Sequence, residues 1–153
     1  MRRLLPWLVR NPDRRADVVV DVVVLWMRVL MGWQLTQTGW GKLHSIDKVA
    51  AWFGGELHIP FPMANAWAAA SVECVGGALL FVGLGSRVAA IPVAFTMCVA
   101  YATSDREALV SFDEFTSAAP FPFLVTALLV AAYGPGRVSL DAVIAKVFGE
   151  ARA

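Results

Sequence analysis

Two residues of opposite charge, Arg28 and Glu73, each lie in the middle of a long apolar stretch of this sequence. Between Leu57 and Ser86 there is no Asp, Glu, Lys or Arg other than Glu73. Stretches of this length span a bilayer, where a lone charge at the helix centre costs roughly 2.5–3.5 kcal/mol. We therefore expect the two side chains to meet inside a helix bundle.

Two kinds of chemistry follow from such a pair. As a structural ion pair, Arg28 and Glu73 would fix the register of two helices. As a polar pocket, they would bind a quinone headgroup or relay a proton, because a guanidinium donates hydrogen bonds and a carboxylate accepts them. The outer mouth of that pocket would be lined by Lys42, Trp33, Gln37 and Tyr101.

The composition places the chain in a membrane. Of 153 residues, 58% are hydrophobic and 16% are charged, against about 25% charged in soluble domains. Basic residues neither cluster nor alternate with aromatic ones, which argues against a nucleic-acid partner. The length suits one domain over residues 1–153.

The apolar segments predict an all-α fold, a bundle of four transmembrane helices at about 18–39, 64–84, 88–103 and 120–134. The second and fourth are the best defined, and the third is short. The run VVVDVVV would favour a strand in water, but a backbone in lipid must satisfy its own hydrogen bonds and so forms a helix. Short amphipathic segments are expected at both termini, the last over about Leu140 to Phe148, and in the first outer loop near Ile46 to Phe53.

The distribution of Lys and Arg predicts the orientation. Nine of these residues face the cytoplasm if the N-terminus is inside, whereas Lys42, Lys48 and Arg106 face out. This is the pattern of a multi-pass protein of a bacterial or archaeal cytoplasmic (inner) membrane with both termini in the cytoplasm. Counting from the span ends places Arg28 and Glu73 about 15 and 16 Å deep, hence at one level.

Periodicity predicts which faces point inward. Small and charged residues recur at three-, four- and seven-residue steps on both helices, and such stripes let membrane helices approach closely. On the first helix the stripe is Asp21, Arg28, Gly32, Leu35, Gly39 and Lys42. On the second it is Ala66, Ala70, Glu73 and Gly77.

Other residue patterns have structural interpretations. Cys74 and Cys98 lie at similar depth and could form a redox dithiol, but packing is favoured because no Cys-x-x-Cys occurs. No Cys/His cluster has metal-site spacing, and neither histidine is intramembrane, so no metal or intrinsic cofactor is expected.

Gly83-Leu84-Gly85 and Gly134-Pro135-Gly136 are typical of helix-end turns. Arg137 is expected to meet lipid phosphate, and Ser139 to cap the last helix with Ala142 at its N3 position.

Four ordered motifs resemble the DoxX family of membrane proteins across about Val18 to Asp141. They are Arg28-V-L-M-Gly32 followed by T-Gly39-W-G-Lys42-L, the run from Glu73-C-V-Gly76-Gly77 to Arg87, Met97-C-V-Ala100, and Gly134-Pro135-Gly136-Arg137-V-Ser139-L-Asp141. The resemblance implies a four-helix membrane bundle linked to thiosulfate:quinone oxidoreduction in archaea and to membrane redox and thiol homeostasis elsewhere. Several relatives carry His where this chain has Tyr101, so any chemistry of that His is absent.

Three function classes remain. The first is a subunit of a quinone-linked or thiol-linked membrane oxidoreductase that takes its electrons from a membrane or peripheral partner protein. The second is a non-catalytic accessory subunit of a larger membrane complex. The third, a transporter built around Arg28 and Glu73, is the weakest because the chain has no internal repeat. A quinone is the candidate ligand, and an oligomer or larger complex is expected.

Overall fold

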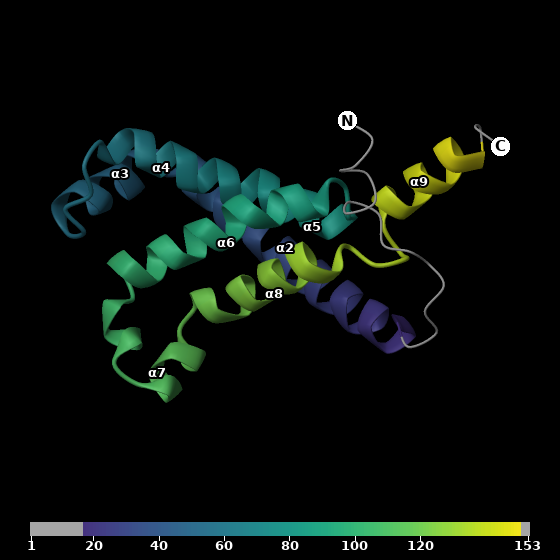
Figure 1. The fold of residues 1–153 in the computed structure, drawn as a ribbon. Helices are drawn as coiled ribbons and strands as arrows, with labels where there is room; N and C mark the ends of the chain where they lie inside the picture. The colour runs from purple at the N-terminus through teal and green to yellow at the C-terminus, as the bar shows by residue number, and fades with distance from the viewer. Residues whose placement is uncertain (1–16, 151–153) are drawn as a thin grey trace.

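The structure is a computed structural model that describes residues 17–150, and over these residues it is helical with connecting turns. The long helical passes run back and forth past one another (Figure 1). They are α2 (Asp17–His44), a continuous second helix built from α4 (Pro62–Ser71), the π-helical turn η1 (Val72–Gly76) and α5 (Gly77–Val82), then α6 (Ser86–Thr103) and α8 (Pro120–Tyr133). The all-α prediction is confirmed. The interfacial helix expected at the N-terminus lies outside the described residues.

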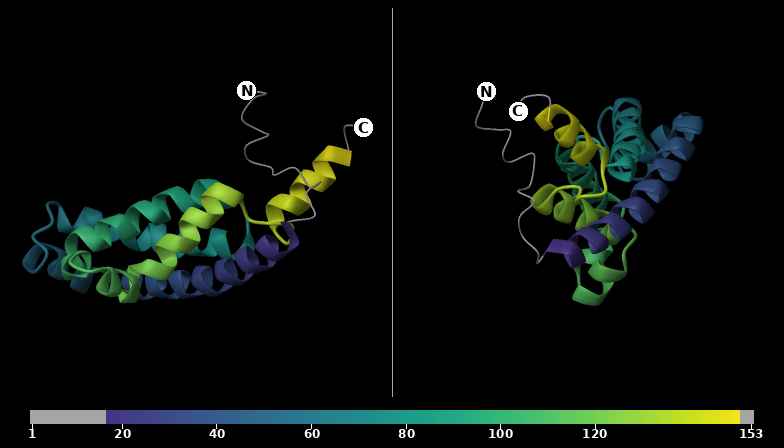
Figure 2. Two further views of the ribbon diagram at one scale, coloured as in Figure 1. Left: turned by 60° about the horizontal axis from the view of Figure 1, so that its bottom comes forward. Right: turned by 90° about the vertical axis from the view of Figure 1, so that its right-hand side faces the viewer.

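Short helices occupy both ends of the bundle. At one end lie α3 (Ile46–Gly55), the 3₁₀ turn η2 (Arg106–Leu109) and α7 (Phe112–Ser117). At the other end, where α2 begins, α9 (Leu140–Glu150) projects past the four passes (Figures 1 and 2). The amphipathic helices predicted in the first outer loop and near the C-terminus therefore exist, as α3 and α9.

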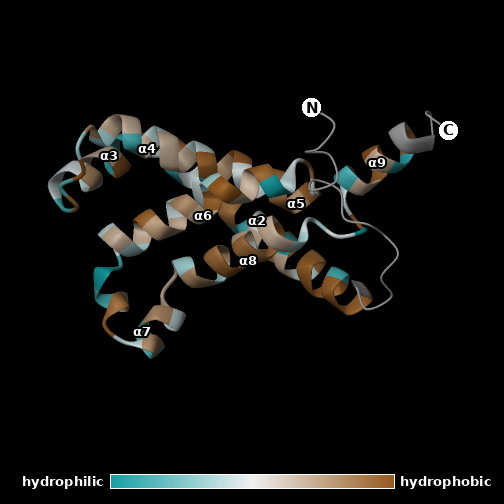
Figure 3. Ribbon diagram, in the orientation of Figure 1, coloured by the Kyte–Doolittle hydropathy of each residue, from teal (hydrophilic) through white to brown (hydrophobic). Residues whose placement is uncertain are grey.

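Three helices are long and apolar enough to cross a membrane: Val18–His44, Pro62–Val82 and Ser86–Thr103. Apolar residues run along them, while hydrophilic ones gather at the connections, as Figure 3 shows between α6 and α7. The fourth predicted span is a helix of 14 residues, shorter than the roughly 20 that a perpendicular crossing needs. Its apolar stretch is divided because α7 ends at Ser117 and Pro120 begins a new helix.

The stripe predicted on the first two passes forms their interface. Ala66, Ala70, Glu73 and Gly77 on the second pass are buried, as are Arg28, Gly32, Leu35 and Gly39 on α2. A Cβ at Gly77 would lie 2.6 Å from the Thr36 nitrogen, and one at Gly32 would lie 2.7 Å from the Phe81 nitrogen. The backbones of the two helices touch at these glycines because glycine has no side chain. Small residues of this kind are common where membrane helices pack together.

At the α9 end, one turn joins the second and third passes. Gly83 adopts a left-handed conformation with φ 76°, and its N–H and that of Leu84 both bond to the Leu79 carbonyl, which ends α5. The Asp141 carboxylate accepts hydrogen bonds from Gly85 N (2.8 Å) and Ser86 N (3.2 Å) at the start of α6. The helix-end turn predicted here is confirmed, and α9 is attached to it.

The segment before α9 confirms one prediction. The Ser139 hydroxyl accepts a hydrogen bond from Ala142 N at 3.1 Å, as expected for the cap of the last helix. The Arg137 Nε lies 3.1 Å from Asp21 Oδ2, an ion pair that the sequence did not suggest. The Arg137 side chain is 48% exposed, so its contact with lipid phosphate stays a prediction.

Replacing Asp141 with alanine should lower the free energy of unfolding by about 1–2 kcal/mol, because two N–H groups at the start of α6 lose their acceptor. Reversible unfolding in mixed detergent micelles measures the change. Asp141→Asn retains one acceptor oxygen and should cost less. Equal losses in the two variants would show that the carboxylate charge, rather than capping, is what matters.

Candidate functional site

The Arg28 side chain is buried, with 2% of the residue exposed. Its Nη1 donates to the carbonyls of Leu80 and Phe81, both at 3.1 Å, and its Nη2 donates to the carbonyl of Val138. The first two belong to the last turn of α5, whose carbonyls have no partner within the helix. A Cβ on Gly83 would lie 2.2 Å from Nη1, so a side chain at this position would displace the guanidinium.

The predicted ion pair between Arg28 and Glu73 is wrong. Glu73 precedes Leu80 by seven residues, or about 10 Å along the helix, and its carboxylate bonds to Lys42 instead. The depth estimate took Val18 as the membrane boundary, but the 28 residues of α2 extend over about 42 Å. Arg28 is therefore level with the turn at Gly83, and its role in the structure is to cap α5 and hold the segment before α9.

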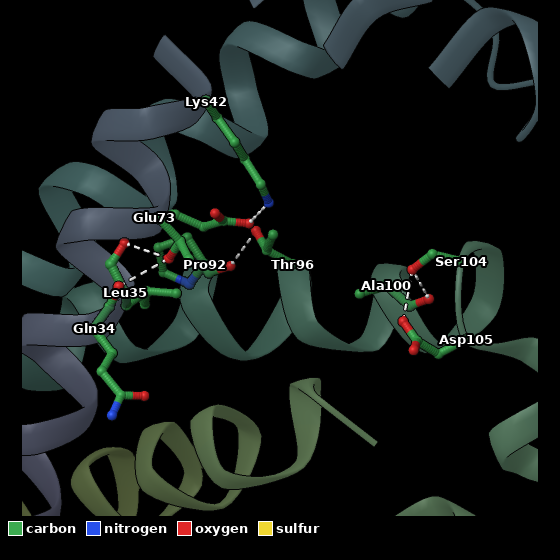
Figure 4. Close-up of polar contacts among 10 residues, drawn as sticks. Gln34, Leu35, Lys42, Glu73, Pro92, Thr96, Ala100, Ser104 and Asp105 are labelled. Carbon is green, nitrogen blue, oxygen red and sulfur yellow. Dashed lines mark hydrogen bonds and ion pairs between the residues drawn. The ribbon is translucent and has the colours of Figure 1, made fainter. Parts of the chain in front are cut away.

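Glu73 forms a second polar site inside the bundle. Its Oε1 lies 2.6 Å from Lys42 Nζ, and the side chains of Lys42 and Glu73 are 35% and 7% exposed. Figure 4 shows the lysine extending from α2 to the carboxylate. The structure thus brings two of the predicted site residues, Lys42 and Glu73, together. The Lys42 ammonium can reach the carboxylate because Lys42 lies about one helical turn beyond Gly39, the residue at which α2 touches the second pass.

The backbone around Glu73 is unusual. Glu73 lies in the π-helical turn Val72–Gly76, a feature frequently found at functional sites. A Cβ on Gly39 would lie 2.2 Å from the Cys74 nitrogen, so α2 presses directly on this turn. The sequence indicated the close approach through its glycines, but it carried no signal for the extra residue in the turn.

One oxygen of the carboxylate is unsatisfied. Glu73 Oε2 is fully buried and has no hydrogen-bond partner among the described residues. A buried acceptor without a donor loses the free energy that water would have given it. The site therefore combines a half-exposed ammonium with a buried acceptor that lacks a donor.

The other residues predicted at the pocket mouth are elsewhere. The Tyr101 hydroxyl donates to the Phe115 carbonyl at 2.7 Å, and its ring stacks on that of Phe115 with centroids 4.6 Å apart. Tyr101 therefore fastens the connection between α6 and α8. Trp33 packs against Phe81 near the end of α5, and Gln37 is exposed. None of these side chains forms a hydrogen bond with Lys42 or Glu73 in the part of the chain that the structure describes.

Both cysteines are free thiols. Cys74 is half-buried beside Gly39, in accord with a packing role, whereas Cys98 is exposed on α6 and does not fill the core as the sequence suggested. Within residues 17–150, no three His, Cys, Asp or Glu side chains are grouped as they would be to hold a metal ion.

An apolar groove of about 320 Å³ shares the π-helical turn with this site, although neither Lys42 nor Glu73 lines it. It is formed where the second pass meets α6, and is lined by Ser71, Val72, Val75, Gly76, Leu79, Ala89 and Pro92. Val72 and Gly76 belong to the same π-helical turn as Glu73. On the other side of the groove, Pro92 interrupts the backbone hydrogen bonding of α6 because proline has no N–H.

Comparison with known proteins gives one result. The sequence profile of the DoxX family matches residues 23–106, more than half of the 153 residues. The match includes α2 from residue 23 onward, the whole second pass and α6, and so contains Arg28, Lys42 and Glu73. No curated protein and no solved structure matches the chain significantly.

Proposed function

Because the chain belongs to the DoxX family of membrane proteins, we propose that it is a membrane subunit of a quinone-linked oxidoreductase system. The buried Glu73 carboxylate, paired with Lys42 at 2.6 Å, is the observation that carries the proposal. A half-exposed ammonium has hydrogens left to donate to a quinone oxygen. A carboxylate in a low-dielectric site can also accept or release a proton as a ring changes its redox state.

The adjacent groove supports the same ligand class. Its walls are almost entirely apolar, and its position in the membrane-spanning part suits the hydrocarbon tail of a quinone. The tail would lie between the second pass and α6 while the ring reaches Glu73 on the same π-helical turn. A lipid-soluble ligand could enter in this way without leaving the bilayer.

A partner protein is part of the proposal. Electrons for the quinone would come from a membrane or peripheral protein, because the described residues form no cluster able to hold a redox metal. The chain would lie in the cytoplasmic membrane with both termini inside, as the excess of Lys and Arg on that side favours. The Lys42–Glu73 pair would then lie toward the outer end of the bundle.

Purification in a mild detergent, followed by native mass spectrometry, tests the proposal. We expect a bound quinone that is lost in Glu73→Gln, because the neutral amide releases Lys42 and removes the proton acceptor. The exposed Glu107→Gln provides a matched control and should retain it. If the wild-type protein carries no quinone and takes up none when it is added, the proposal is wrong.

Filling the groove should separate tail binding from ring binding. Val75 is 58% exposed and lines the groove, so Val75→Trp should lower the affinity for a long-tailed quinone about tenfold while preserving the fold. A tail-less benzoquinone should bind the variant as it binds the wild type. Val88→Trp, which changes a similarly exposed valine outside the groove, is the control for binding measured in lipid nanodiscs. Equal affinities in both variants would exclude the groove as the tail site.

The second candidate is an accessory subunit without chemistry. The structural roles of Arg28 and Tyr101 favour it, since both bind backbone carbonyls and not a ligand site. It predicts a fixed stoichiometry with other membrane subunits and no quinone in the mass spectrometry experiment above.

A further inference from the structure

The side of α2 turned away from the second pass carries exposed side chains in a heptad pattern. They follow one another in steps of four and three residues, the spacing with which two helices wind around each other. Trp26, Trp33 and Trp40 recur every seven residues and are 67%, 52% and 60% exposed. We call the set the tryptophan stripe, and all its members are exposed: Val19, Val23, Trp26, Leu30, Trp33, Gln37, Trp40 and His44.

Gln37, a member of this stripe, lies at the level of the membrane-spanning segments. Gly39, two residues further along α2, is where an added Cβ would lie 2.2 Å from the Cys74 nitrogen. Two residues correspond to about 3 Å along a helix, so Gln37 is nearly level with Cys74. Cys74 is about 12 Å from the nearer end of the helix Pro62–Val82, which is long and apolar enough to cross a membrane. The Gln37 amide is therefore exposed at a depth where hydrocarbon surrounds the protein.

Two amides on this side of α2 lack a hydrogen-bond partner. Gln34 and Gln37 are both exposed, and neither amide forms a hydrogen bond with the residues that the structure describes. Figure 4 shows the Gln34 amide directed away from the Lys42–Glu73 pair. An amide placed in hydrocarbon without a partner loses the hydrogen bonds that water would have given it. Lipid alone is thus a poor cover for this face, and a polar partner within the membrane is indicated.

We propose that the tryptophan stripe is an interface between two copies of this chain. Copies with the same orientation in a bilayer are related by a two-fold axis along the membrane normal, so their α2 helices pair in parallel. Each residue near the axis then meets its own counterpart at the same height. An amide both donates and accepts, so Gln37 can bond to the same residue of the second copy.

The composition of the stripe favours a second copy over a different partner. It contains no Asp, Glu, Lys or Arg, any of which would repel its counterpart across the axis. The charged residues of this part of α2, Asp21 and Arg28, lie on the other side of the helix and bond within the chain. Indole rings stack on one another, and amides in membrane helices bond across helix pairs. Neither Lys42 nor Glu73 belongs to the stripe, so the interface can form whether or not a quinone binds.

Disulfide cross-linking in native membranes tests the interface directly. The full chain, with Cys74 and Cys98 replaced by alanine, receives one cysteine at a time and is treated with a mild oxidant. Trp33→Cys and Gln37→Cys should give a covalent dimer of the chain. Ile91→Cys, at a 57% exposed position on α6, is the matched control and should remain monomeric. If the stripe cysteines give no dimer, or link only to a different protein, the inference is wrong.

The contribution of the amides is measured by dimerisation in liposomes at increasing dilution, using two differently labelled populations of the protein. Replacing Gln34 and Gln37 together by leucine should raise the dissociation constant of the dimer about tenfold, because the hydrogen bonds between the copies are lost. Leucine suits hydrocarbon, so the fold should be retained, and Ile91→Ala should dimerise as the wild type does. A wild type that stays monomeric, or a double variant that dimerises equally well, would overturn the inference and leave the proposed function standing.

Discussion

Replacing Gly39 with alanine should lower the free energy of unfolding by about 3 kcal/mol, although alanine is the better helix former. The added methyl group would lie 2.2 Å from the nitrogen and 2.7 Å from the Cα of Cys74. Both are backbone atoms, so no side-chain rotation relieves the overlap and the two helices must move apart. Reversible unfolding in mixed detergent micelles measures the loss.

Gly41 provides an unusually close control. It lies two residues later on α2, and a Cβ there would meet nothing within 4 Å. Gly41→Ala should therefore be neutral or stabilise by up to about 1 kcal/mol, through helix propensity alone. If the two variants change stability equally, the contact between α2 and the π-helical turn does not hold the bundle together.

Replacing Arg28 with methionine should cost about 3–5 kcal/mol. The variant keeps much of the side-chain volume but removes every donor from the carbonyls of Leu80, Phe81 and Val138. Hydrogen bonds to a charged donor contribute about 1.5–3 kcal/mol each, and carbonyls that stay buried after its removal have no replacement. The same unfolding experiment applies, and limited proteolysis of α9 reports whether the Val138 segment loosens.

Two further variants test the geometry of this contact. Arg28→Lys keeps the charge, but a compact ammonium cannot reach carbonyls on two separate segments as a planar guanidinium does, so an intermediate loss is expected. Arg137→Met removes a 48% exposed side chain at the Asp21 ion pair and should cost at most about 1 kcal/mol. Similar losses in Arg28→Met and Arg137→Met would contradict the capping role of Arg28.

The sequence was sufficient to predict which faces of the first two passes are buried. Spacing alone identified Gly32, Gly39 and Gly77, because helical periodicity depends only on local geometry. The cap at Ser139 and the turn at Gly83 were predicted for the same reason, since both depend on a few neighbouring residues. Sequence patterns therefore predict a feature well when that feature depends only on residues close to it in the sequence.

The partners of the charged residues could not be predicted in the same way. Which cation meets Glu73 depends on how far one helix slides along the other, and the two candidate cations are about 21 Å apart along α2. Arg28 and Lys42 differ by 14 residues on one face, so both were geometrically acceptable. In addition, the acceptors that Arg28 finds are backbone carbonyls, which are present at every residue and so leave no pattern in a sequence.

The unequal lengths of the helices have a consequence for the surrounding lipid. The 28 residues of α2 extend over about 42 Å, whereas the 14 residues of α8 extend over only about 21 Å. A hydrocarbon core of about 30 Å is too thin for the first helix when upright and too thick for the last. Thinning of the bilayer beside α8 and tilting of α2 would both relieve this mismatch, so we expect the length of the lipid acyl chains to affect the stability of the bundle.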